Sequence, residues 1–93
     1  MYRLIFTEDA QKDIRLLNKK APTAVPKLKE LLAELKVDPR DGTGKVEMLK
    51  GFDRETWSRR INHEHRLVYQ IDEPKQEVLI LAAYGHYLHQ ADQ

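Results

Sequence analysis

The sequence has no cysteine, no long apolar run, and a net charge of only +1. Without cysteine, disulfides, thiolate metal ligands and cysteine nucleophiles are all excluded. No segment approaches the roughly 20 apolar residues that span a bilayer. The apolar stretch at residues 2–6 is too short for a signal peptide, and acidic residues follow it at once. We therefore expect a cytoplasmic protein that makes no membrane contact.

A near-neutral charge argues against a protein that coats nucleic acid by bulk electrostatics. It still allows a local basic cleft, because the position of the charges matters more than their sum. Arg59, Arg60 and Arg66 fall close together, and His63 and His65 lie between the last two. This stretch is therefore the first place to look for an anion-binding site.

The pattern of apolar residues predicts one strand, two helices and then three or four strands in a single domain of 93 residues. Residues 2–6 are rich in aromatic and branched side chains, as in a strand. Thr7 is a typical N-cap for a helix that runs to about Asn18. A second apolar stripe predicts a helix that ends at Asp38-Pro39. The later strands are expected at residues 46–50, 56–62, 66–71 and 77–84.

The predicted order of elements limits the fold. Consecutive strands joined by short turns must run antiparallel, and two adjacent helices can cover only one face of such a sheet. We therefore predict an α+β fold, with a twisted antiparallel β-sheet and the two N-terminal helices packed on one face. The other face should remain a partly open concave surface, which is where a site is expected.

Alternation along the strand expected at residues 56–62 puts Arg59 in the apolar row and Arg60 in the opposite row. If the apolar row faces the helices, Arg60 faces the open side, where Arg66 of the next strand can join it. Two arginines on one face suit a phosphate, because each guanidinium can bind phosphate oxygens with two hydrogen bonds. The same spacing is also typical of a solvated face with ion pairs to Glu64 or Glu73.

Four further residues could take part in chemistry, and each has an ordinary alternative. Glu47 facing the arginines would suit a general base, but is also a common kind of surface residue. His86 beside a phosphate could protonate a leaving oxygen, or simply be exposed. His63 and His65 have the spacing of metal ligands on one side of a strand, but no cysteine or carboxylate pattern completes a site. No metal or cofactor is expected, and periodicity alone names no reaction.

Residues 57–69, Trp-Ser-Arg-Arg-Ile-Asn-His-Glu-His-Arg-Leu-Val-Tyr, resemble the signature stretch of the YoeB (Txe) toxins of the RelE/ParE superfamily. Residues 4–8, residues 44–50 and the pair His86-Tyr87 match the family in the same order and spacing. The resemblance therefore covers essentially residues 2–87. It implies one toxin domain over residues 1–87, followed by a short tail at 88–93.

The resemblance implies a fold like that of microbial ribonucleases, and a ribosome-dependent endonuclease that cuts messenger RNA in the decoding site without a metal. In this mechanism Glu47 takes the proton of the 2′-hydroxyl, Arg66 and Arg60 stabilise charge on the phosphate, and His86 protonates the 5′ oxygen. The implied catalytic residues are Glu47, Arg66, His86 and Tyr87. The substrate-binding residues expected with them are Arg60, Lys50 and Arg59.

The same resemblance implies that the protein is the toxin of a type II toxin–antitoxin system. Its partners would be the ribosome and a cognate YefM/Axe-type antitoxin, whose disordered acidic segment folds over the basic cleft. DNA would be contacted only through the antitoxin complex, and a homodimer of the toxin is left open. The alternative is a non-catalytic protein on the same scaffold, either a ParE-like gyrase inhibitor or an antitoxin-binding co-repressor. The presence of both Glu47 and His86 argues against that alternative.

Overall fold

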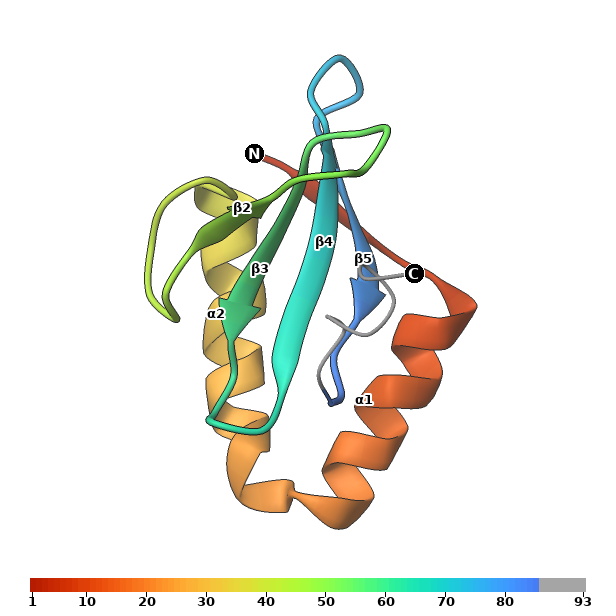
Figure 1. Cartoon of the computed structure of the whole chain (residues 1–93), viewed down its shortest axis with the longest axis vertical. Coiled ribbons are helices and arrows are strands. Elements are labelled where there is room, and N and C mark those ends of the chain that lie inside the picture. Colours follow the sequence, from red (N-terminus) through yellow and green to blue (C-terminus); the bar gives the residue numbers. More distant parts are fainter. Residues whose placement is uncertain (86–93) are drawn as a thin grey trace.

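The computed structural model describes residues 1–85, so His86, Tyr87 and the predicted tail at 88–93 lie outside the described residues. Within that range, two helices pack on a five-stranded sheet (Figure 1). The predicted order of elements is confirmed. The elements are β1 (Arg3–Phe6), α1 (Glu8–Lys20), the 3-10 turn η1 (Pro22–Ala24), α2 (Val25–Val37), β2 (Glu47–Leu49), β3 (Thr56–Arg60), β4 (Arg66–Asp72) and β5 (Glu77–Ala82).

The first helix begins at the predicted N-cap. The Thr7 hydroxyl oxygen accepts a hydrogen bond from the Ala10 N–H at 3.0 Å, which satisfies one of the free donors of the first turn. Two acidic residues follow in the first turn, and two lysines occupy the last turn. Both arrangements complement the helix dipole. The helix therefore continues two residues beyond the predicted end at Asn18, to Lys20.

The sheet has the strand order β1-β5-β4-β3-β2. The consecutive strands β2 to β5 pair antiparallel, as the short turns between them require. β1 instead pairs parallel to β5, with Arg3 opposite Glu77 and Phe6 opposite Ile80. The sheet is therefore mixed. The short-turn rule does not apply to this pair, because the two helices and three strands separate β1 from β5 in the chain.

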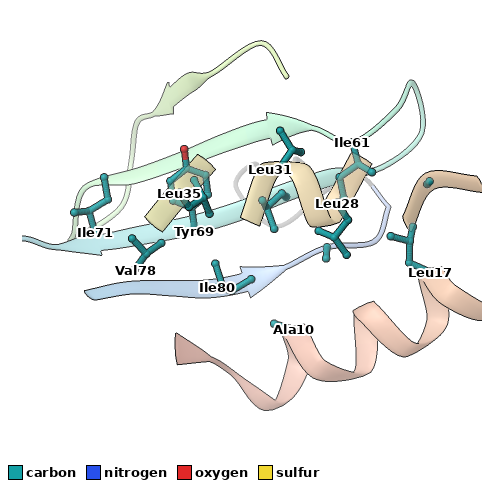
Figure 2. Close-up of a cluster of buried hydrophobic side chains, with 13 residues drawn as sticks. Ala10, Leu17, Leu28, Leu31, Leu35, Ile61, Tyr69, Ile71, Val78 and Ile80 are labelled. Carbon is teal, nitrogen blue, oxygen red and sulfur yellow. The ribbon is translucent and has the colours of Figure 1, made fainter. Parts of the chain in front are cut away.

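The core lies between the helices and the sheet, as Figure 2 shows. Alternate residues of the two central strands β4 and β5 face the helices and are buried, whereas α2 contributes a leucine stripe. Leu31 and Leu35 are completely buried within this stripe. The main side chains of the cluster are Ala10, Leu17, Leu28, Leu31, Leu35, Ile61, Leu67, Tyr69, Ile71, Val78 and Ile80.

Both helices have 13 residues. At 1.5 Å per residue each is about 20 Å long, shorter than the roughly 30 Å of a bilayer core. Across residues 1–85, no helix has the length and apolar character needed to cross a membrane.

A polar cluster around Arg40 ties together the loops at one end of the sheet. The Arg40 guanidinium binds both oxygens of Glu55, at 2.8 and 3.0 Å, and reaches Glu73 at 3.0 Å. The Trp57 indole N–H also donates to Glu55, at 2.7 Å. The hydrogen bonds from Arg40 lower the pKa of Glu55, and the Trp57 N–H and the charge of Arg40 act in the same direction against partial burial.

The core packing predicts a large effect for Leu31→Ala. Removing this buried side chain leaves a cavity that α2 and the sheet cannot close, so the free energy of unfolding should fall by about 2–5 kcal/mol. Urea unfolding followed by circular dichroism measures the change. Val37→Ala, at a position 71% exposed on the same helix, is the control and should stay within about 0.5 kcal/mol of wild type. Equal effects at both positions would contradict the assigned core.

The Arg40 cluster predicts a defined dependence of stability on pH. Because the folded pKa of Glu55 is lowered, its contribution is complete above its unfolded pKa of about 4.3 and is lost as the pH falls through the folded value. Glu55→Gln should therefore destabilise the protein at neutral pH, and the difference from wild type should shrink towards acidic pH. Urea midpoints across that range measure it. Asp53→Asn removes an exposed carboxylate from the same loop and is the control; a pH-independent difference for Glu55→Gln would refute the assignment.

Candidate functional site

Two arginines lie side by side at one end of the open sheet face. Arg60 ends β3 and Arg66 begins β4, and the two are direct partners in the antiparallel register. Residues opposed in this way point to the same face with their Cβ atoms about 4.5–5.5 Å apart. Both side chains are half-buried. The prediction that they share one face is confirmed.

Glu47 occupies the same face one strand further out. It is exposed on β2 and lies opposite Ser58, which precedes Arg60 by two residues and so shares its row. The rows of β2, β3 and β4 therefore place the Glu47 carboxylate on the face that carries Arg60 and Arg66. Lys50, also exposed, follows β2 directly.

The turn between β3 and β4 holds Arg66 and its neighbours in place. The Asn62 side-chain oxygen accepts hydrogen bonds from the N–H groups of Glu64 and His65, at 2.9 and 2.8 Å. The Arg66 guanidinium in turn donates to the Asn62 carbonyl at 3.2 Å. Three hydrogen bonds therefore close the turn before β4, and one of them holds the Arg66 guanidinium at the Asn62 carbonyl.

His65 anchors the end of the described chain against β4. It is 6% exposed, its Nδ1 accepts a hydrogen bond from the Gly85 N–H at 2.8 Å, and its ring lies 4.3 Å from that of Tyr84. The Arg66 N–H donates to the Gly85 carbonyl at 3.2 Å. Gly85, the residue before His86, is therefore held beside Arg66. Sequence analysis missed this role because the partner of His65 lies 20 residues further along the chain.

The two histidines weighed as metal ligands do not act together. His65 is buried and bound to Gly85, whereas the His63 side chain is 85% exposed beside Glu64. Among the residues that the structure describes, no group of three or more histidine or acidic side chains is placed to hold a metal ion.

The expectation that Arg59 binds substrate is wrong. Its side chain is completely buried on the helix side of the sheet. Nε donates to the Tyr69 hydroxyl at 3.0 Å and Nη1 to Glu34 at 2.6 Å. Nη2 donates to the carbonyls of Asp38 and Asp41, at 3.0 and 2.9 Å. All three nitrogens are used inside the protein, so Arg59 presents no donor to a ligand on the open face.

Arg59 shapes the loop that leads into β2. A Cβ atom added at Gly42 would lie 2.4 Å from Arg59 Nη1, and one at Gly44 would lie 2.9 Å from the Arg60 carbonyl oxygen. Both glycines also have positive φ values, of 143° and 87°, which side chains rarely adopt. The Gly44 carbonyl accepts the Arg60 N–H. The loop therefore lies against the Arg59 side chain at Gly42 and against the Arg60 backbone at Gly44, so it connects the buried arginine to the candidate site.

Glu34 is the acidic partner of the buried Arg59 guanidinium. Partial burial would raise the pKa of Glu34, but hydrogen bonds from the Thr43 N–H and hydroxyl, together with the charge of Arg59, lower it overall. The carboxylate therefore stays ionised and pairs with the buried guanidinium.

Arg59→Met is predicted to destabilise the fold severely, although Arg59 lies outside the open face. The change leaves the Glu34 charge and two loop carbonyls without their donor, which should lower the free energy of unfolding by about 3–5 kcal/mol. Arg54→Met, at an exposed position, should remain within about 0.5 kcal/mol of wild type. Urea unfolding measures both; an Arg59→Met variant as stable as Arg54→Met would refute the role assigned to Arg59.

Comparison with known proteins places this geometry in context. Residues 6–87 match the family model described as "YoeB-like toxin of bacterial type II toxin-antitoxin system". The chain is 36% identical over 85 residues to Toxin YoeB of Synechocystis sp. (strain ATCC 27184 / PCC 6803 / Kazusa). That alignment covers 91% of this chain and 96% of the relative.

Solved structures of similar sequence share the fold. A YoeB/ParE toxin from Agrobacterium tumefaciens superposes with a TM-score of 0.82 at 33% identity, covering 94% of this chain and all of that one. The YoeB dimer from Staphylococcus aureus gives 0.79 at 34% identity, covering 92% and 98%. YoeB in the heterotetrameric YoeB–YefM complex from the same organism gives 0.76 at 34%, covering 94% and 99%.

Proposed function

Because the chain belongs to the YoeB-like toxins of bacterial type II toxin–antitoxin systems, we propose that it is a ribosome-dependent endonuclease that cuts messenger RNA without a metal. The observation that carries this proposal is the cross-strand pair of Arg60 and Arg66 on the open face, with Glu47 on the same face. This arrangement offers two guanidinium groups for one phosphate and a carboxylate nearby.

The state of Arg60 supports a phosphate site. Its Nε is buried and has no hydrogen-bond partner among the described residues. A buried donor without an acceptor is rare in folded proteins, and like charges directly opposite each other destabilise a pair of strands. A phosphate bound between Arg60 and Arg66 would supply acceptors for both groups and neutralise their repulsion.

RNA carries its own nucleophile, so the protein needs to supply only a base, an acid and charge stabilisation. Glu47 removes the proton of the 2′-hydroxyl, whose oxygen then bonds to phosphorus while the bond from phosphorus to the 5′ oxygen breaks. Arg60 and Arg66 stabilise the charge that develops on the phosphate oxygens. His86, which follows Gly85 in the chain, gives a proton to the departing 5′ oxygen. The products are a 2′,3′-cyclic phosphate and a 5′-hydroxyl end.

Two more residues and two partners complete the proposal. Lys50 would contact outer phosphates, and Tyr87 would orient the substrate or stack on it. A net charge of +1 is too small to hold RNA by electrostatics alone, so the ribosome would present the mRNA. A YefM/Axe-type antitoxin would cover the arginines with an acidic segment, as a partner of the kind bound by the S. aureus relative, and DNA would be contacted only through that complex.

Purified protein mixed with translating ribosomes and end-mapped mRNA tests this function. Wild type should cut, whereas Glu47→Gln and His86→Ala should slow cutting by about 10²–10⁴-fold and Arg66→Ala by about 10²–10³-fold. Arg15→Ala, which removes an exposed arginine on α1 outside the site, is the control. Intact mRNA with the wild-type protein would falsify the proposal. Loss of cutting on addition of a chelator, with ribosomes still intact, would overturn the metal-free mechanism.

A further inference from the structure

We propose that a cavity on the open face binds one nucleobase of the substrate RNA and selects a base that carries an exocyclic amino group. The inference rests on the proposed nuclease function and assigns the part of the protein that recognises sequence. The cavity has a volume of about 220 Å³ and lies between the start of α1, the loop after β2, and strands β4 and β5. Its lining includes Asp9, Lys12, Asp13, Phe52, Val68 and Leu81.

The cavity and Arg66 share strand β4. Val68 follows Arg66 by two residues on β4, so the two side chains point to the same face about 7 Å apart. The loop that joins β2 to β3 reaches across β4 (Figure 1), and it carries Phe52 to the cavity wall. Lys50, proposed to contact RNA phosphates, belongs to the same loop. A strand of RNA held by Arg66 would therefore pass the mouth of the cavity.

The size and walls of the cavity suit a single planar ring. Its volume falls below the roughly 300–1,000 Å³ of pockets that hold drug-sized ligands. Val68 and Leu81 line it with apolar atoms, and Phe52 is 37% exposed. Proteins that bind single-stranded RNA commonly pair a backbone contact with an aromatic ring on which an unpaired base stacks. Phe52 is placed to provide that ring at the cavity.

The charged groups of the cavity distinguish the base from the backbone. Asp9 and Asp13 project from the first turns of α1, and an ionised carboxylate only accepts hydrogen bonds. One oxygen of Asp13 accepts the Ala83 N–H at 3.0 Å, which holds this carboxylate at the cavity. Lys12 is the one cation in the lining, so with the two aspartates the cavity keeps a net negative charge, which repels phosphate, while the carboxylate oxygens pair with donors on a base edge. Adenine, cytosine and guanine offer exocyclic amino groups, whereas uracil offers carbonyl oxygens in their place.

Cytidine and uridine monophosphates form a matched pair of probes, because the amino group at C4 of one base is a carbonyl oxygen in the other. Each is titrated into isotope-labelled protein while the Val68 and Leu81 methyl signals and the Phe52 ring signals are followed by NMR. We expect CMP to shift these signals and to bind at least about ten-fold more tightly than UMP. Ribose 5-phosphate, which lacks a base, should leave the Phe52 ring signals in place.

Single substitutions in the cavity test which side chains contact the base. Phe52→Ala should weaken CMP binding by about five-fold to 150-fold, the range expected for loss of one stacked base. Asp9→Asn should reduce the preference for CMP over UMP, since a neutral amide oxygen is a weaker acceptor than a carboxylate. Val37→Ala, at an exposed position on α2, is the control and should change neither quantity.

Three results would overturn the inference: equal binding of CMP and UMP, equal shifts with ribose 5-phosphate, or no shift of the cavity signals by any nucleotide. In the last case, a shift of the same signals on deletion of residues 88–93 would assign the cavity to the chain's own C-terminal residues. These measurements need no ribosome. Protein that binds CMP in the cavity but leaves mRNA intact would therefore refute the proposed nuclease and keep the cavity assignment.

Discussion

The buried guanidinium of Arg59 holds the helix layer, the loop after α2 and the sheet in one arrangement. A charged group without solvent exposure costs several kcal/mol unless its hydrogen-bonding groups are satisfied. Here its three nitrogens donate to Glu34 of α2, to the Tyr69 hydroxyl of β4, and to the carbonyls of Asp38 and Asp41. Moving any one of these elements would leave a buried donor or acceptor unpaired. The loop therefore has one conformation compatible with the core, and it delivers the chain to β2 and Glu47.

This internal arrangement turns Arg59 away from the opposite face, which neither of the described helices covers. Alternation along β3 turns Arg59 inward and Arg60 outward, so adjacent residues of one type have opposite roles. Arg59 has all its nitrogens paired, whereas the Nε of Arg60 is buried without a partner among the described residues. The fold thus tolerates an unmet donor at the place where an anion would satisfy it. The stability of the packed core offsets the cost of this unsatisfied donor.

The open face combines two surfaces of opposite charge. Arg60 and Arg66 favour a phosphate, whereas the cavity next to Val68 presents Asp9 and Asp13 to whatever enters it. If RNA binds here, its backbone is drawn to the arginines and excluded from the cavity. The two surfaces would then orient the strand as well as hold it. Specificity of this kind depends on repulsion as much as on attraction.

Local sequence determined much of this protein: the Thr7 cap, the two apolar helix stripes, and the row that brings Arg60 beside Arg66. These features follow from periodicity and capping, which act over a few residues. Alternation also placed Arg59 in the apolar row, although it was expected to bind substrate together with Arg60 and Lys50. Tertiary structure decided its burial, because its acceptors Glu34 and Tyr69 lie 25 and 10 residues away.

The direction of β1 and the role of His65 were likewise decided by tertiary structure. β1 pairs with β5, more than 70 residues along the chain, and His65 binds Gly85. No short-range pattern encodes such contacts, because they form only when burial of the apolar core brings distant segments of the chain together. Sequence therefore determined which side chains share a face, and the packed fold decided which of those faces the two helices cover among residues 1–85.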